Sequence, residues 1–230
     1  MRSAPARVTN FTVHGVGPYA RELDSGEAAT WIDIRQLEQV LDDVMERPAV
    51  RLTFDDGNCS DVQIALPRLL ERGLTAEFFP IAGLIGEPGR FDRSGLRELV
   101  AAGMSIGSHG WAHRDWRSLD DSSASQEIDQ AIRRLSQLAG QPVHRVAVPF
   151  GSYDRTVLRR LRQAGVSRVY TSDGGRARID AWLQPRTSLR SAMAVGWAQN
   201  VADERTGPVQ DAQRFAIRSV KRCRGPVKPR

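Results

Sequence analysis

The sequence has few cysteines and no long apolar run. Its two cysteines, Cys59 and Cys223, lie far apart, so they form neither a closely spaced metal-binding pair nor a disulfide framework. No apolar stretch approaches the roughly 18 residues of a membrane-spanning helix, and residues 1–10 carry arginines but no apolar signal-peptide core. The sequence therefore predicts a soluble, cytoplasmic protein whose cysteines take no part in its chemistry.

Excess charge is absent from most of the chain. From Pro208 onward, seven Lys or Arg residues are opposed by one acidic residue, Asp211, so this segment accounts for the whole formal net charge of +6. It is either a solvated tail with a partly packed helix or an anchor for an anionic membrane or another polyanion. No nucleic-acid recognition motif stands out in the neutral remainder, so we expect no nucleic-acid partner. We also expect removal of residues 208–230 to spare activity.

Helices and strands alternate along the chain. Two strands, at residues 11–16 and 49–54, flank a helix at 34–45. Four units of amphipathic helix, glycine and apolar strand then follow, at 66–83, 96–110, 128–151 and 157–175. Such alternation predicts a parallel sheet, either closed as a barrel or open and doubly wound. With 40% hydrophobic residues, the chain fits one domain over residues 1–207, followed by the basic helix or tail of residues 208–230.

Polar, glycine-rich clusters follow the predicted strands. Both architectures place active sites at the carboxyl ends of parallel strands. Five strand ends should therefore meet at one face, at residues 14–15, 55–57, 108–110, 149–151 and 172–175.

The segment Thr53 to Gly57 ends a strand in two adjacent carboxylates, Asp55 and Asp56. One can bind a cation while the other stays ionised beside it and accepts a proton from water. The alternative is a turn in which one Asp caps the following helix.

His109 and His113 have the i, i+4 spacing that lets two imidazoles bind one metal ion when the backbone between them is helical or tightly turned. They follow a predicted strand and should therefore face Asp56. Two imidazoles and one carboxylate leave open coordination positions, as in hydrolytic metal sites.

The segments at 53–57, 109–113 and 149–151 resemble the first three motifs of the polysaccharide deacetylase family, also known as NodB homology domains, chitooligosaccharide deacetylases or carbohydrate esterase family four. This resemblance implies a distorted (β/α)7-type barrel. It implies a hydrolase that removes N-acetyl groups from a polysaccharide, oligosaccharide or glycan precursor, with a divalent metal, usually Zn²⁺, although Co²⁺, Ni²⁺ or Mn²⁺ are alternatives. Its implied roles are Asp55 as general base, Asp56, His109 and His113 as metal ligands, and the backbone N–H of Phe150, between Pro149 and Gly151, as oxyanion donor.

Two departures from the family pattern affect the expected mechanism. Ala147 stands where the family commonly has an Arg that steadies the base, and Arg186 either replaces that Arg or is an ordinary surface residue. The family's late His, which protonates the leaving amine, has no counterpart after His144. His14 ends a strand at the catalytic face and is the better candidate acid; His144 begins its strand. Alternatively, His14 has a structural role, and Asp55 passes the proton taken from water to the leaving amine.

Three further residues are candidates for substrate contact. Trp111 and Trp182 can stack on sugar rings, or serve in packing, which is the commoner use of Trp. Asp173 can orient Arg186 or touch substrate, or be a turn residue. The competing functions are a degenerate, metal-containing glycan-binding homologue and a hydrolase of a non-sugar amide or an O-acetyl ester.

Overall fold

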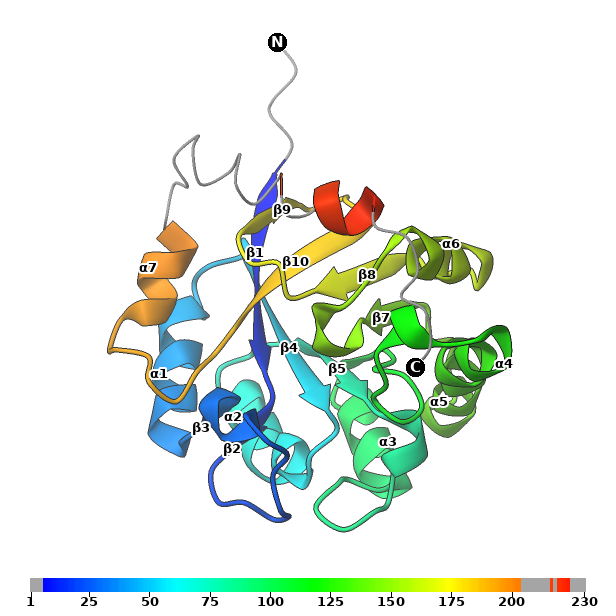
Figure 1. Ribbon diagram of the computed structural model, residues 1–230. Helices are drawn as coiled ribbons and strands as arrows, with labels where there is room; N and C mark the ends of the chain where they lie inside the picture. The colour runs from blue at the N-terminus through cyan, green and yellow to red at the C-terminus, as the bar shows by residue number, and fades with distance from the viewer. Residues whose placement is uncertain (1–5, 204–215, 217–218, 224–230) are drawn as a thin grey trace.

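The computed structural model describes residues 6–203, 216 and 219–223 (Figure 1). Its centre is a ring of seven parallel strands. In spatial order these strands are β6 (Ser105–Ile106), β5 (Ala76–Pro80), β4 (Val50–Asp56), β1 (Arg7–Val13), β10 (Leu183–Ser188), β8 (Arg168–Thr171) and β7 (Arg145–Ala147). A parallel bridge between Ser108 and Val146 joins β6 to β7 across the remaining gap. The ring is therefore nearly closed, which confirms the barrel.

Helices cover the outside of the ring, as Figure 1 shows. They are α1 (Ile34–Val44), α2 (Leu66–Glu71), α3 (Arg93–Ala101), α4 (Asp121–Ala124), α5 (Ala131–Ala139), α6 (Arg155–Gln163) and α7 (Trp197–Asp203). π-helical turns at Asp61–Ala65 and Ser125–Gln130 lead into α2 and α5. All five predicted helices are present, with ends shifted by a few residues.

Shorter elements complete the fold. The two-residue strands β2 (Gly15–Val16) and β3 (Trp31–Ile32) pair with each other, and β9 (Arg176–Arg178) pairs antiparallel with β1. The alternation of helix and strand did not predict β9. Single 3-10 turns lie at Glu27–Thr30, Ala82–Leu84, Trp116–Ser118 and Pro149–Gly151. Within the described part of the chain, no helix combines the length and apolar content needed to cross a membrane.

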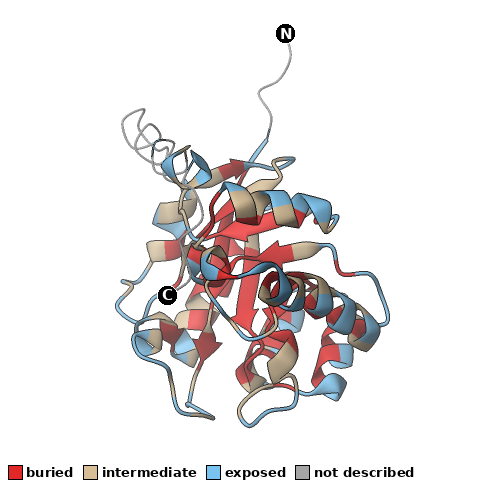
Figure 2. Ribbon diagram, turned by 45° about the vertical axis from the view of Figure 1, so that its right-hand side comes forward, coloured by how far each residue is buried: buried red, intermediate tan, exposed pale blue. Residues whose placement is uncertain are grey.

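The helix α1 shows how local sequence directs packing. Asp33 caps its first turn by accepting a hydrogen bond from the Gln36 backbone N–H at 2.7 Å. Its buried side chains recur at helical spacing and face the strands: Leu37, Val40, Leu41 and Val44. Figure 2 shows the result for the whole domain, with buried strands inside and helices whose outer faces are exposed.

Strand β4 separates two environments by the alternation of its side chains. Leu52 and Phe54 belong to the apolar core that includes the covering helices. Thr53 and Asp55 face the interior of the ring, where the Thr53 hydroxyl contacts Thr12 at 3.0 Å and Arg186 at 3.1 Å. The barrel interior is therefore partly polar, and Asp55 lies at the carboxyl end of β4.

Candidate active site

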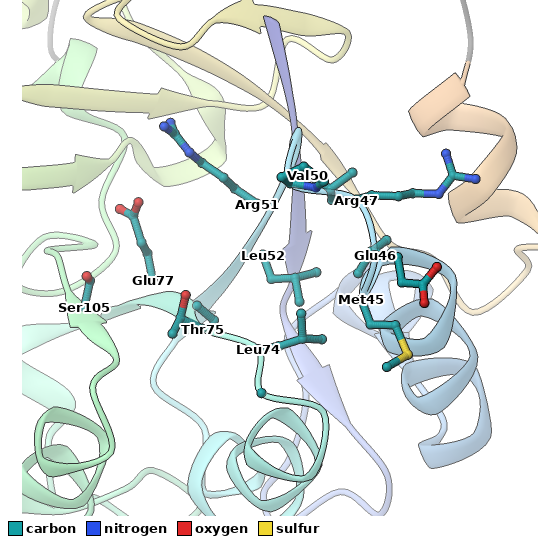
Figure 3. A pocket seen from close by; sticks show the side chains of 14 residues that line it. Met45, Glu46, Arg47, Val50, Arg51, Leu52, Leu74, Thr75, Glu77 and Ser105 are labelled. Atoms are coloured by element: carbon teal, nitrogen blue, oxygen red, sulfur yellow. The ribbon is translucent and has the colours of Figure 1, made fainter. Parts of the chain in front are cut away.

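Two cavities lie at opposite ends of the strands. The cavity in Figure 3, about 530 Å³, is lined by the first residues of β4, β5 and β6, including Arg51, Glu77 and Ser105. The other, about 770 Å³, lies at the carboxyl ends. Of the candidate residues, this second cavity is lined by His14, Asp55, Asp56, His109, His113, Phe150, Gly151 and Arg186. The convergence expected from the strand ends is therefore present in the structure.

Asp55 is buried at the end of β4 and forms a two-pronged ion pair with Arg186. The two guanidinium nitrogens Nη1 and Nη2 donate to Oδ1 at 2.7 Å and to Oδ2 at 2.6 Å. Burial disfavours ionisation, but the charge of Arg186 and its hydrogen bonds outweigh it and lower the pKa of Asp55 to about 2. Asp55 is therefore a carboxylate at neutral pH and can accept a proton.

Arg186 is 4% exposed and is not a surface residue. Its guanidinium lies 5.6 Å and 5.7 Å from the ring centres of Phe79 and Tyr170, which pack with Ala147. Ala147, which stands where the family commonly has its Arg, is thus part of an aromatic cluster. The cation beside Asp55 is instead Arg186, which lies on β10.

Asp56, His109 and His113 present ligand atoms that all lie within 4.8 Å of one another. The His109 and His113 Nε2 atoms are 3.6 Å and 3.9 Å from Asp56 Oδ1. That Oδ1 is buried and has no hydrogen-bond partner among the described residues. A buried, unpaired carboxylate oxygen facing two imidazole nitrogens fits a divalent cation.

The backbone around these candidate ligands adopts unusual conformations. Asp56 and His113 have φ of 74° and 55°, in the left-handed region that non-glycine residues rarely adopt. His113 thus reaches the cluster through a tight turn, one of the two backbone forms expected for this spacing. His109 Nδ1 lies 2.8 Å from Ala147 O, so the ring is held with its Nε2 directed at Asp56. Burial and the neighbouring His109 lower the pKa of His113 to about 4, so the His113 imidazole is neutral at pH 7.

His14 lies between β1 and β2, with Nε2 4.0 Å from Asp55 Oδ2. Burial lowers its pKa, although Asp55 and Asp56 oppose the shift. His144, in contrast, is exposed and precedes β7 at the opposite end of the barrel. The structure therefore places His14, and not His144, beside the predicted base.

The Pro149–Gly151 turn forms another wall of the cavity. Pro149 and Gly151 are buried, whereas the Phe150 side chain is 65% exposed and its ring centre lies 4.4 Å from that of His113. Phe150 has φ of 57° and ψ of 7°. The turn therefore brings this peptide beside a predicted metal ligand.

Residues 42–169 match the family profile described as polysaccharide deacetylase, which is more than half of the chain. The chain belongs to the polysaccharide deacetylase family. This assignment confirms the family expected from the three motifs. It also supports the expected enzyme class, a hydrolase of carbon–nitrogen bonds other than peptide bonds.

Individual proteins agree with the family assignment. YxkH of Bacillus subtilis, named as a polysaccharide deacetylase of putative status, is 27% identical over 131 residues, covering 57% of this chain and 47% of its own length. A chitin deacetylase of Pestalotiopsis is 29% identical over 114 residues, covering 50% and 38%. The chain thus spans about half the length, or less, of these two curated relatives. The Streptococcus pyogenes deacetylase PplD, solved with acetate, superposes with a TM-score of 0.77 at 19% identity over 87% of this chain and all of its own, which shows the shared fold.

Four candidate residues do not line the cavity: Pro149, Trp111, Asp173 and Trp182. Trp182 precedes β10 at the opposite end of the barrel, where its indole donates to Val166 O at 2.8 Å and stacks with Arg162, so its assignment to substrate binding is wrong. Trp111, between His109 and His113 in the chain, packs against the core beneath Arg134. It is not among the residues that line the cavity.

Asp173 does not orient Arg186, contrary to one expectation. Its Oδ2 accepts hydrogen bonds from Tyr153 Oη at 2.8 Å and Thr171 Oγ1 at 2.9 Å, and its Oδ1 pairs with Lys221 at 2.6 Å. The carboxylate points away from the base because these three donors fix it at the end of β8.

Glu127 supports the ligand loop and was not found from the sequence. Its side chain is buried, and its oxygens accept hydrogen bonds from the backbone N–H groups of Trp111 and Ala112 and from the Trp116 indole. The sequence signal that could have identified Glu127 is its position directly before Ile128, at the start of the apolar face of the predicted helix. This network holds the segment between His109 and His113.

Proposed function

We propose that the protein is a metal-dependent deacetylase that removes N-acetyl groups from a polysaccharide, oligosaccharide or glycan precursor. The observation that carries the proposal is the pairing of Asp55 with Arg186 beside the cluster of Asp56, His109 and His113. A pure binding protein has no need of a carboxylate held ionised next to three potential ligands. This disfavours the glycan-binding alternative.

The metal ligands in this proposal are Asp56, His109 and His113. Their mixed nitrogen and oxygen donors fit Zn²⁺, with Co²⁺, Ni²⁺ or Mn²⁺ as alternatives. Bound there, the ion would supply Lewis-acid polarisation of the acetyl carbonyl and a lowered pKa for water.

The side chains divide the proton transfers. Asp55 accepts the proton of the attacking water, because its negative charge is maintained by Arg186. The Phe150 backbone N–H donates to the oxygen of the acetyl carbonyl as negative charge develops on it. His14, whose Nε2 lies 4.0 Å from Asp55 Oδ2, takes up the proton that Asp55 has accepted from water and delivers it to the leaving amine.

The substrate class rests on the family and on the cavity. A volume of about 770 Å³ is suited to a sugar unit with its neighbours. A relative named chitin deacetylase favours N-acetylglucosamine chains as the first substrates to test. The division into a catalytic barrel at 1–207 and a basic tail at 208–230, and an affinity of that tail for anionic membrane, stay predictions.

Acetate release from N-acetylglucosamine oligomers tests the proposal. Activity should disappear on chelation and return with Zn²⁺. Binding of the oligomers without acetate release by metal-loaded protein would favour the degenerate homologue. Release from O-acetylated xylan or a simple amide, but not from the oligomers, would favour the hydrolase of a non-sugar amide or an O-acetyl ester.

A further inference from the structure

A lysine near the C-terminal end contacts the turn that carries the Phe150 N–H. Residues 219–223 are helical and form part of the red segment in Figure 1. Lys221 Nζ lies 2.6 Å from Asp173 Oδ1 and donates to Gly151 O at 3.1 Å. It also lies 5.3 Å from the centre of the Tyr153 ring. One side chain therefore connects the end of β8 with the Pro149–Gly151 turn.

Asp173 explains why Lys221 is fixed in this position. The Asp173 side chain is 1% exposed, and among the described residues its ion-pair partner is Lys221. A buried carboxylate that loses its counter-ion is strongly destabilised. The hydroxyls of Tyr153 and Thr171 occupy the other oxygen, so Oδ1 remains for the ammonium.

The turn itself needs external support. Phe150 and Gly151 are both left-handed, with φ of 57° and 58°, and a non-glycine residue rarely adopts this conformation without surrounding contacts. Ser172 provides one contact, because a Cβ on Gly151 would lie 1.8 Å from Ser172 Oγ. The bond from Lys221 to the Gly151 carbonyl provides another.

We propose that Lys221 is a positioning residue: it holds the Pro149–Gly151 turn, and with it the Phe150 N–H, in the geometry that receives the developing oxyanion. The inference rests on the proposed deacetylase function. It also replaces the expectation that residues 208–230 can be removed without loss of activity, because that segment supplies Lys221.

The test compares three full-length variants. Lys221→Met removes the ammonium and Lys221→Arg keeps a cationic donor. Arg222→Met is the matched control, since Arg222 is an exposed neighbour on the same helical segment. In Lys221→Met, kcat for N-acetylglucosamine oligomers should fall by about tenfold to a hundredfold, because a displaced donor is felt mainly in the transition state. KM and metal content should stay near wild type, Lys221→Arg should keep most of the activity, and Arg222→Met should match wild type.

Hydrogen–deuterium exchange of residues 148–153 provides a readout that needs no turnover. Exchange should be faster in Lys221→Met and unchanged in Arg222→Met. Wild-type kcat and exchange in Lys221→Met would overturn the inference, as would an equal kcat loss in Arg222→Met or a loss that only follows the fraction of unfolded protein. If the wild type releases no acetate, the proposed function fails, and the exchange comparison alone decides whether Lys221 holds the turn.

Discussion

Arg186 donates hydrogen bonds to both carboxylate oxygens of Asp55, although the two residues are 131 positions apart in the chain. They lie on β10 and β4, on either side of β1. The pair keeps a buried carboxylate ionised next to the proposed metal ligands. Its consequences can be tested from both partners.

Asp55→Asn should lower kcat by at least about a hundredfold, the scale of a lost general base. Metal content should stay near normal, because Asp55 is not one of the proposed ligands. Acetate release and elemental analysis of the same preparation check both statements. Unchanged kcat would remove Asp55 from the mechanism, whereas loss of metal would exchange the roles of Asp55 and Asp56.

Arg186→Met should destabilise the fold by roughly 3–5 kcal/mol, because it leaves Asp55 buried without its cation. Denaturant unfolding measures this loss. The double variant Arg186→Met, Asp55→Asn removes the uncompensated charge and should recover part of the stability. If the double variant is no more stable than Arg186→Met, the buried charge is not the cause.

The double variant His109→Ala, His113→Ala should lose the bound metal, because one carboxylate remains of the three proposed ligands. Elemental analysis after dialysis checks the stoichiometry. His144→Ala is the matched control, since His144 is exposed at the other end of the barrel. Retention of wild-type stoichiometry in the double variant would place the metal elsewhere.

His14→Ala should reduce kcat by roughly 100-fold or more while KM and metal content change little, as expected for a general acid. The position of its Nε2, 4.0 Å from Asp55, supports this role. His144→Ala should be nearly silent here as well. A His14→Ala variant with the wild-type kcat across the pH profile would assign delivery of the proton to Asp55.

Asp61→Asn should stabilise the protein at neutral pH. Burial first, and then the charge of Asp56, raise the pKa of Asp61 well above its usual value. The unfolded chain therefore releases this proton at a lower pH than the folded chain, and stability falls as pH rises above about 4. The variant lacks this loss, and its advantage, on the order of 1 kcal/mol, should disappear below that pH. Urea unfolding at several pH values, with metal content held constant, measures the difference; an equal advantage at all pH values would contradict the cause.

Local patterns located the proposed metal ligands because each one lies at the carboxyl end of a strand or in the loop that follows it. Asp56 ends β4, and His109 and His113 follow β6, so the parallel direction of the strands was enough to bring them together. The same reasoning placed His14 correctly at the cavity. It failed for Trp182, which lies four residues before Arg186, about 13 Å along the strand direction, and packs beneath Arg162 of α6.

The sequence by itself thus determined the alternation of helix and strand, the face that carries the chemistry, and the residues at each strand end, since all of these depend on local period and chain direction. Only the tertiary structure decided that the sheet closes through Ser108 and Val146, that Arg186 partners Asp55, and that Asp173 turns to Lys221. These contacts join strands and segments far apart in the chain. They depend on how the ring closes and on which buried charges then find a counter-ion, and neither condition leaves a local pattern in the sequence.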